Sequence, residues 1–332
     1  MFRIEDIQNP IVDNFQRNGG SGLISILPLD NIPVDIPNSW KYKPTCMPVE
    51  YKSRAEAFAN FKVRKDDIWI VTYPKCGTTW TQEMTWMLMN DLNFDEAKSV
   101  DITQRSIYFE LEGMIPTDEW KHFDLLNEQK SPRVIKSHLP ISLLPRDIWR
   151  KKCKIIYVAR DFKDAIISFY HHFTGMTPYK GSIEEFIEGI LTDNMIYCSY
   201  WNHVLEFWLI REQPNILFLT FEDMKKDLKT ILEVTSKFLK KEYTEKQICS
   251  LVEHLSFDNM KKHSTCNNQG LVKALYAVSN YEYNEKTSFQ FMRKGQVGGY
   301  KKEMSSSFID RINLKTKELF EPYGLNLYYG DS

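Results

Sequence analysis

The stretch Asp67-Ile-Trp-Ile-Val-Thr-Tyr-Pro-Lys-Cys-Gly-Thr-Thr-Trp80 decides how this chain folds. Its first seven residues are mostly apolar, which predicts a strand buried on both faces of a parallel sheet. Residues 74–77 read as a turn. Residues 78–91 place apolar side chains at the i, i+4, i+7, i+8 spacing of one helix face, namely Trp80, Met84, Met87 and Leu88. The sequence therefore predicts a strand–loop–helix unit.

The turn between this strand and this helix has the composition of a phosphate-binding loop. Backbone N–H groups at a helix start are unpaired and attract anions. Gly77 lets the main chain approach an anion closely, while Lys75 adds positive charge and Thr78 and Thr79 add hydroxyl donors. The order differs from G-x-x-x-x-G-K-[ST], because the lysine precedes the glycine by two positions. Taken alone, the loop is equally compatible with an ordinary connection that carries a solvated lysine.

Strands and helices alternate along the rest of the chain. Further strands are expected at 133–138, 154–160 and 215–221, and helices at 164–173, 197–211, 226–239, 245–255 and 305–319. This alternation predicts an α/β fold with one domain over 66–325, in which helices flank a mainly parallel sheet. Residues 1–65 hold six prolines and no clear periodicity. We expect them to form an irregular arm of the same domain, with a helix near 53–60, and we expect 267–287 to be a loop.

Composition argues against several classes of protein. The 332 residues carry 43 Lys and Arg against 44 Asp and Glu, a formal net charge of −1, which disfavours nucleic-acid binding through bulk positive charge. No window approaches the apolar length of a membrane-spanning helix, and the N-terminus lacks the pattern of a signal peptide. The six cysteines form no C-x-x-C pair and no metal-ligand spacing with histidine. We expect a cytoplasmic protein without membrane contact, nucleic acid or bound metal.

Several motifs in a fixed order resemble the cytosolic sulfotransferases. Residues 72–80 match the 5′-phosphosulfate loop T-Y-P-K-S-G-T-T-W except at Cys76. Lys136-Ser-His-Leu-Pro140 resembles K-T-H-L-P, and Arg293-Lys-Gly-Gln-Val-Gly298 resembles R-K-G-x-x-G. Other matching stretches are Tyr157–Asp161 with Asp164 and Ser168, Glu222–Lys225, and Ser256-Phe257 with Met260-Lys261. The resemblance covers residues 67 to 310.

The resemblance implies a P-loop-like sulfotransferase fold that uses 3′-phosphoadenosine 5′-phosphosulfate and releases adenosine 3′,5′-bisphosphate. It implies that His138 is the general base, a role that suits an imidazole titrating near pH 6.5. Lys75 and Lys136 are the other candidate catalytic residues, because their charges would stabilise the sulfuryl group and the leaving phosphate. The implied cofactor-binding residues are Lys75, Cys76, Gly77, Thr78, Thr79, Trp80, Arg160, Ser168, Phe221, Ser256, Phe257, Met260, Phe291, Met292, Arg293, Lys294 and Gly295.

The implied acceptor is a small lipophilic compound whose hydroxyl or amine receives the sulfuryl group, such as a phenol, a sterol or another alcohol. Its candidate binding residues are Tyr108, Leu111, Phe169, His172 and Tyr283, with Phe109 and Tyr281 in the same segments. Aromatic side chains suit flat apolar ligands. Any one of them could equally belong to the core.

The chain departs from the family pattern at four further places. Phe221 replaces a tyrosine, Leu255 replaces a threonine, and Gly299-Tyr300 replaces D-W. Residues 301–310 resemble the family's dimer segment only faintly, so homodimerisation is left open. Two alternatives also stay open: sulfation followed by elimination, which dehydrates an allylic alcohol such as a retinoid, and nucleotide binding without catalysis. The order of lysine and glycine in the loop disfavours a nucleotide kinase.

Overall fold

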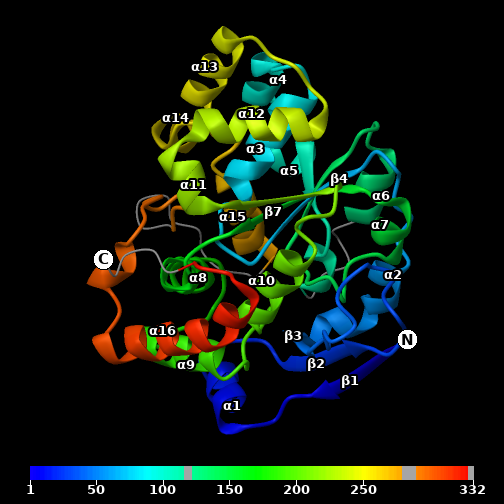
Figure 1. Cartoon of the computed structure of the whole chain (residues 1–332). Coiled ribbons are helices and arrows are strands. Elements are labelled where there is room, and N and C mark those ends of the chain that lie inside the picture. The colour runs from blue at the N-terminus through cyan, green and yellow to red at the C-terminus, as the bar shows by residue number, and fades with distance from the viewer. Residues whose placement is uncertain (116–121, 279–288, 328–332) are drawn as a thin grey trace.

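The computed structural model describes residues 1–115, 122–278 and 289–327. At its centre lies a parallel sheet with the strand order β5-β6-β4-β7-β8 (Figure 1). The strands are β4 (Ile68–Thr72), β5 (Ser106–Tyr108), β6 (Val134–Ser137), β7 (Lys154–Ala159) and β8 (Ile216–Thr220). The predicted α/β fold with a mainly parallel sheet flanked by helices is confirmed.

The central strand β4 is buried along its whole length, because both of its faces contribute to a core. Ile68 and Ile70 belong to one cluster of buried apolar side chains, whereas Trp69 and Val71 belong to the other. The neighbouring strand β7 divides its residues between the same two clusters. This alternation follows from the two-residue period of a strand and explains why the sequence of β4 is nearly continuously apolar.

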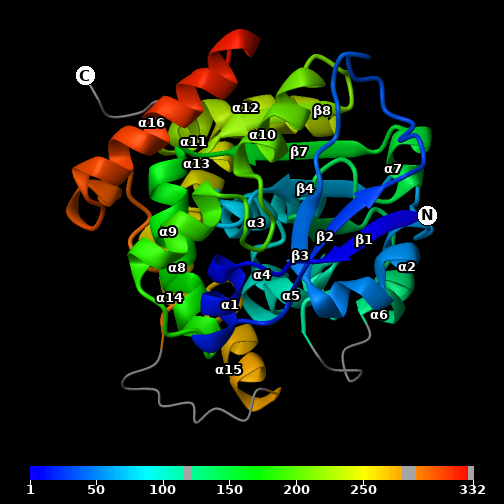
Figure 2. The same ribbon diagram turned by 90° about the horizontal axis from the view of Figure 1, so that it is seen from below.

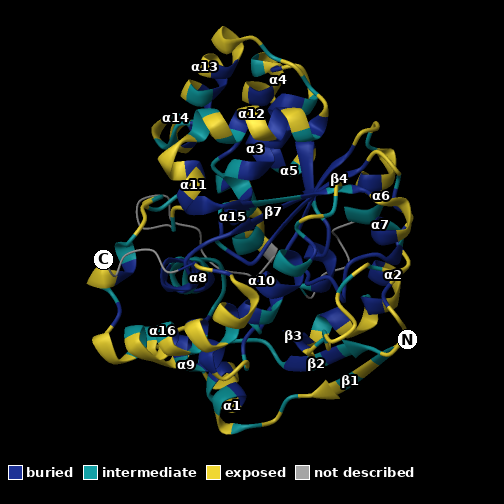
Figure 3. Ribbon diagram, in the orientation of Figure 1, coloured by how far each residue is buried: buried dark blue, intermediate teal, exposed yellow. Residues whose placement is uncertain are grey.

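Helices cover both faces of the sheet, as Figure 1 and the view from below in Figure 2 show. One face carries α3 (Thr78–Met89), α11 (Phe221–Lys226), α12 (Leu228–Leu239), α13 (Glu245–His254) and α14 (Phe257–Lys262), beside α4 (Phe94–Ser99) and α5 (Ile102–Arg105). The other face carries α8 (Phe162–Met176), α9 (Ile183–Leu191), α10 (Tyr200–Leu209) and α16 (Ser306–Phe320). The outer faces of α13 and α16 are exposed while the strands between them are buried (Figure 3).

Residues 1–65 are not the irregular arm that the sequence suggested. They form an antiparallel sheet of β1 (Phe2–Asp6), β2 (Leu23–Pro28) and β3 (Thr45–Pro48), with α1 (Pro10–Arg17) between the first two strands. The helix expected near 53–60 is present as α2 (Ala55–Ala59) after a 3-10 turn at Val49–Ser53. Three of the prolines mark boundaries, since Pro10 begins α1 and the other two end β2 and β3. Proline is well tolerated at helix starts and strand ends.

The prediction of a loop at 267–287 is also wrong in part. Residues Gln269–Val278 form α15, residues 267 and 268 precede it without regular structure, and residues 279–287 lie outside the described part of the chain. The remaining helices are α6 (His122–Glu128) and α7 (Arg146–Lys151). Within α15, Leu271 and Leu275 stand four residues apart on one helix face and line a cavity. One pair of leucines in a ten-residue segment is too short a pattern to separate a helix from a loop.

A buried ion pair joins the starts of β4 and β6. Arg133 donates to both carboxylate oxygens of Asp67, and its remaining terminal nitrogen Nη1 donates to the carbonyl of Leu126 at 2.9 Å. Both charged side chains are fully buried. The pair therefore sets how the first residues of two neighbouring strands meet.

Because removal of one partner leaves a buried charge without compensation, Arg133→Met should lower the free energy of unfolding by about 3–5 kcal/mol. The double variant Asp67→Asn/Arg133→Met should cost less than the sum of the two single changes. Urea denaturation of the three variants measures both effects. A loss below about 1 kcal/mol in the Arg133→Met protein would show that the pair does not anchor the strands.

Candidate active site

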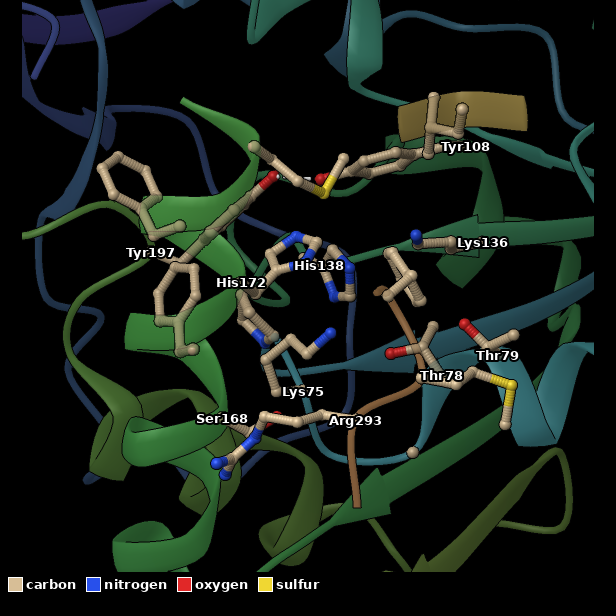
Figure 4. A pocket seen from close by; sticks show the side chains of 18 of the residues that line it. Lys75, Thr78, Thr79, Tyr108, Lys136, His138, Ser168, His172, Tyr197 and Arg293 are labelled. Carbon is tan, nitrogen blue, oxygen red and sulfur yellow. Dashed lines mark hydrogen bonds between the residues drawn. The ribbon is translucent and has the colours of Figure 1, made fainter. Parts of the chain in front are cut away.

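All five parallel strands end at one edge of a cavity of about 650 Å³. Parallel strands have their carboxyl ends on the same side, which is where α/β folds bind ligands. Each strand contributes the residue or loop that follows it: Tyr108 from β5, His138 from β6, Lys75 after β4, Arg160 from β7 and Phe221 from β8. Figure 4 shows the side chains of Lys75, Lys136, His138 and His172 converging in the middle of this cavity.

The loop between β4 and α3 adopts an unusual backbone conformation. Gly77 has a φ of 104° and Lys75 a φ of 68°, so two of its residues lie in the left-handed region that glycine accepts at no steric cost. A Cβ atom at Gly77 would also stand 3.0 Å from the ring of Phe221. The helix α3 starts directly after Gly77 without a side-chain cap. Its first N–H groups and the hydroxyls of Thr78 and Thr79 are therefore donors of the kind that suit an anion.

Buried lysines carry the positive charge of the cavity. Burial, together with the charges of Lys136, Arg160 and Arg293, lowers the pKa of Lys75 to about 7. Burial likewise lowers the pKa of Lys136 to about 8. The two ammonium groups lie over aromatic rings, Lys75 at 4.2 Å from the centre of Phe291 and Lys136 at 4.1 Å from that of Tyr108. Among the described residues neither ammonium group forms an ion pair with a carboxylate, and buried cations of this kind favour binding of an anion.

The imidazole of His138 is held in one tautomer. Its Nδ1 lies 2.8 Å from the carbonyl oxygen of Thr72, and because a carbonyl only accepts, Nδ1 must donate. The proton therefore sits on Nδ1 and leaves the lone pair on Nε2. Burial and the charge of Lys136 lower the pKa of His138 well below its ordinary value. The ring is thus neutral at physiological pH and able to accept a proton.

Arg160 ties the phosphate loop to the C-terminal loop. Its guanidinium donates to the carbonyl of Lys75 at 3.0 Å and to that of Gln296 at 2.8 Å. Its Nε is buried and has no hydrogen-bond partner among the described residues. Asp164, one turn along α8, accepts from the backbone N–H groups of Gly298 and Tyr300 at 2.6 and 3.0 Å. The loop that carries Arg293 and Lys294 is thereby fastened to the start of α8.

Both basic side chains of that C-terminal loop contact one carboxylate. Arg293 and Lys294 donate to Glu303 at 2.8 and 3.0 Å, and His171 contacts the other oxygen of the same group. Burial alone would raise the pKa of the Glu303 carboxyl, but hydrogen bonds from these three side chains lower it to about 2. Ser168 lines the cavity beside this loop.

Aromatic side chains form one end of the cavity beyond the phosphate loop. Trp80 and Phe221 meet edge to face with ring centres 5.8 Å apart, and Phe257 lies against Gly295, where a Cβ atom would stand 2.5 Å from its ring. Met260 and Met292 line the same cavity. This arrangement suits a flat heterocycle such as a nucleobase.

The opposite end of the cavity is apolar. It is lined by Tyr108, Leu111, Met114, Phe169, His172, Phe173, Met176, Ile196 and Tyr197. His172 packs edge-on against Phe291 at 5.1 Å, and burial lowers its pKa well below the ordinary value. The neutral ring therefore adds no charge to this wall.

Most residues that the sequence singled out line this one cavity, but Cys76, Ser256 and Phe109 do not. Cys76 is buried beneath the loop, and its Sγ lies 3.8 Å from the carbonyl of Pro74. The hydroxyl of Ser256 caps α14 instead of facing the cavity. Tyr283, like Tyr281, lies outside the described residues. Phe109 is fully buried among Trp69, Phe58 and Phe61 and belongs to the core.

Sequence analysis missed several residues of the site. Gly19, Gly20, Ser21 and Glu50 from the N-terminal segment line the cavity, as do Asp164 and Tyr197. Asp164 belongs to a segment that matches the sulfotransferase pattern, but the match implies no role for it. The N-terminal residues carried no motif, because their place depends on the pairing of β2 with β3. In the parts of the chain that the structure describes, no cluster of three side chains suited to a metal ion occurs, and no helix is long and apolar enough to cross a membrane.

Comparison with known proteins defines the class. Residues 65–324 match the sulfotransferase domain family. The chain is 35% identical to luciferin sulfotransferase from Photinus pyralis over 82% of this chain and 77% of that protein, and 37% identical to sulfotransferase 1B1 from Mus musculus over 74% and 80%. It therefore belongs to the sulfotransferase family.

The fold resembles that of retinol dehydratase along almost the whole chain. The structure of that protein in complex with androsterone and the inactive cofactor PAP has a TM-score of 0.83 at 24% identity, with 99% of this chain and 98% of that chain covered. The complex of retinol dehydratase with retinol and PAP has a TM-score of 0.81 at the same identity. These likenesses show the shared architecture, including the N-terminal part that the family match leaves out.

The lowered pKa values of the two lysines predict how anion binding depends on pH. A bound polyanion favours the charged lysines, so adenosine 3′,5′-bisphosphate should bind with uptake of protons. Its affinity should fall by about tenfold between pH 7.5 and 9, where the phosphate groups have finished titrating. Isothermal titration calorimetry measures this. Lys75→Arg, which stays charged, should flatten the profile, and a flat profile in the unaltered protein would contradict the buried-lysine argument.

Proposed function

We propose that this chain transfers the sulfuryl group of 3′-phosphoadenosine 5′-phosphosulfate to a hydroxyl group, or an amine, of a small lipophilic acceptor. One observation carries the proposal: a neutral His138 with its lone pair on Nε2 stands beside two buried lysines where the phosphate loop meets an apolar chamber. A base, an anion site and an apolar acceptor site thus share one cavity.

The residues present fit the nucleotide that this function requires. The start of α3 and the side chains of Lys75, Thr78 and Thr79 would hold the 5′-phosphate group. Arg160, whose buried Nε lacks a partner among the described residues, would hold the 3′-phosphate together with Ser168 and the loop residues Arg293, Lys294 and Gly295. Trp80, Phe221 and Phe257 would enclose the adenine. When bound, the nucleotide supplies an activated sulfuryl group on a phosphate that can leave.

The protein's own groups have separate tasks in this transfer. Nε2 of His138 takes the proton of the acceptor hydroxyl, while the bond from Nδ1 to Thr72 keeps that lone pair available. Lys75 and Lys136 stabilise the negative charge that develops on the leaving phosphate oxygen, as preorganised cations do in a site that excludes water. The apolar wall from Leu111 to Met176 excludes water and positions the acceptor.

The apolar chamber supports a flat or elongated lipophilic acceptor. Its wall is formed by aromatic, methionine and aliphatic side chains. Such side chains bind an acceptor through buried apolar area and complementary shape, and the hydroxyl of the acceptor is then its polar recognition group. Neither of the two alternatives, dehydration or nucleotide binding without catalysis, is favoured by a particular contact of these residues. Analysis of the products distinguishes them from simple sulfation.

Thermal unfolding with and without adenosine 3′,5′-bisphosphate tests the cofactor site first. Ligand at 100 times its dissociation constant should add about 2.7 kcal/mol to the free energy of unfolding. ATP with Mg²⁺ is the control and should give a much smaller shift. Stabilisation by ATP alone would refute the proposed cofactor and point to phosphoryl transfer instead.

His138→Ala should lower kcat about 10²–10⁴-fold, because it removes the general base. Its affinity for the bisphosphate should stay within about threefold of the unaltered protein, since the imidazole is neutral and adds no charge to the anion site. Steady-state kinetics with a phenol or sterol acceptor measure kcat, and calorimetry measures the affinity for the bisphosphate. His263→Ala, at a histidine that does not line the cavity, is the matched control and should leave kcat unchanged.

A further inference from the structure

We propose that Glu110 is a positioning residue of this site, whose buried carboxylate orients the groups around His138 and holds a positive charge on Lys136. The inference rests on the proposed function for the roles of His138 and Lys136. Glu110 was not among the residues that the sequence singled out, and the transfer step described above does not use it.

The carboxylate of Glu110 joins three separate segments of the chain. It follows β5 and is fully buried. Its Oε1 accepts from the backbone N–H of His138 at 2.6 Å and from the hydroxyl of Tyr197 at 3.2 Å. The carbonyl of His138 in turn lies 3.0 Å from Nε2 of His203. The main chain of the candidate base is therefore held on both sides, just beyond the end of β6.

The same oxygen sets the direction of a chain of hydroxyl groups. An ionised carboxylate only accepts, so Tyr197 donates to Glu110, and Tyr108 must then donate to Tyr197 across their 2.6 Å contact. The rings of Tyr108 and Tyr197 stand edge-on to the imidazole of His138, at 5.3 and 5.7 Å between centres. One carboxylate thus orients both aromatic rings that enclose the base.

Tyr197 needs this support because its backbone is strained. Its φ of 65° lies in the left-handed region, which a bulky residue adopts only at a cost in free energy. Hydrogen bonds between Cys46 of β3 and the 197–198 segment, at 2.8 and 3.2 Å, hold its main chain. The N-terminal sheet and Glu110 therefore act on the same side chain, one through the backbone and the other through the hydroxyl.

Lys136 lies beside the segment that carries Glu110, because its Nζ stands 4.1 Å from the centre of the Tyr108 ring and its carbonyl accepts from the N–H of Phe109 at 2.9 Å. Burial lowers the pKa of the Lys136 ammonium to about 8, and the attraction of Glu110 is the effect that opposes this fall. Burial raises the pKa of Glu110 to about 7, against the hydrogen bond from His138. Above pH 7 the carboxylate is thus ionised and favours the charged lysine. The titratable groups that surround the pair are Tyr51, Lys75, Tyr108, His138, His172, Tyr197 and His203.

Two variants separate the effect of the negative charge of Glu110 from the effect of its hydrogen bonds. Glu110→Gln keeps an oxygen that can accept from His138 and Tyr197 but removes the negative charge. Tyr197→Phe keeps the charge and removes one hydrogen bond. Because a buried carboxylate is costly to desolvate, Glu110→Gln should melt at the same temperature as the unaltered protein or above it.

The first measurement is an NMR titration of lysine side chains labelled at Cε, with the Lys136 signal assigned through Lys136→Arg. Glu110→Gln should lower the pKa of Lys136 by about one unit. Tyr197→Phe should leave it within about 0.3 unit. An unchanged or higher Lys136 pKa in Glu110→Gln would overturn the proposed counter-charge. This readout needs neither nucleotide nor acceptor, so it stands apart from the test of the proposed function.

The second measurement compares turnover. At pH 6.5, where Glu110 itself is largely protonated, Glu110→Gln should keep kcat/KM within about threefold of the unaltered enzyme, and the alkaline limb of its profile should lie at lower pH. Glu110→Ala should lose at least about tenfold in kcat at pH 6.5, because the base is no longer held. Equal kcat values for the Gln and Ala variants would overturn the positioning role. Absence of turnover in the unaltered protein would instead refute the proposed function.

Discussion

Parallel pairing of β4 with both β6 and β7 is the constraint on which the site depends. The register aligns Ile68 with Val134 on one side and with Lys154 on the other, so the three strands end together. The loop with Lys75, the residue His138 and the guanidinium of Arg160 follow these three ends directly. Residues that are more than 60 positions apart in sequence therefore meet because their strands run in the same direction. The ion pair of Arg133 with Asp67 secures this register from the opposite edge.

The cost of burying positive charge explains much of the chemistry. Lys75 and Lys136 lose hydration and form no ion pair with a carboxylate in the part of the chain that the structure describes, which is why their pKa values fall toward neutrality. The charged form of such a buried lysine is stabilised strongly when an anion binds beside it. The positive charges of Arg293 and Lys294 are instead balanced within the protein, because both side chains donate to the carboxylate of Glu303. The cavity thus combines charges prepared for a ligand with charges already paired inside the protein.

The sequence predicted those parts of the fold whose apolar pattern or residue order lies within a short stretch of the chain. The strand at β4, the loop and α3 lie within about twenty consecutive residues, so apolar pattern and composition predicted them. The antiparallel sheet of residues 1–65 could not be predicted this way, because β2 pairs with strands across long connections, the first of which holds α1. The same reason hid Glu110 and Tyr197, whose importance arises from contacts across 87 positions of the chain. The side chains of Cys76 and Ser256 do not line the cavity, which shows that matching a motif does not by itself direct a side chain toward a cavity.

The sequence by itself determined the α/β class, the phosphate loop, the sulfotransferase family and the residue types that its chemistry needs. These depend on short stretches whose apolar period or residue order is visible without neighbours. Only the tertiary structure decided which nitrogen of His138 carries the proton, which lysines lose hydration and which carboxylate acts on Lys136. Tautomer, desolvation and charge pairing are set by groups brought together from distant segments, and no local pattern encodes such distances.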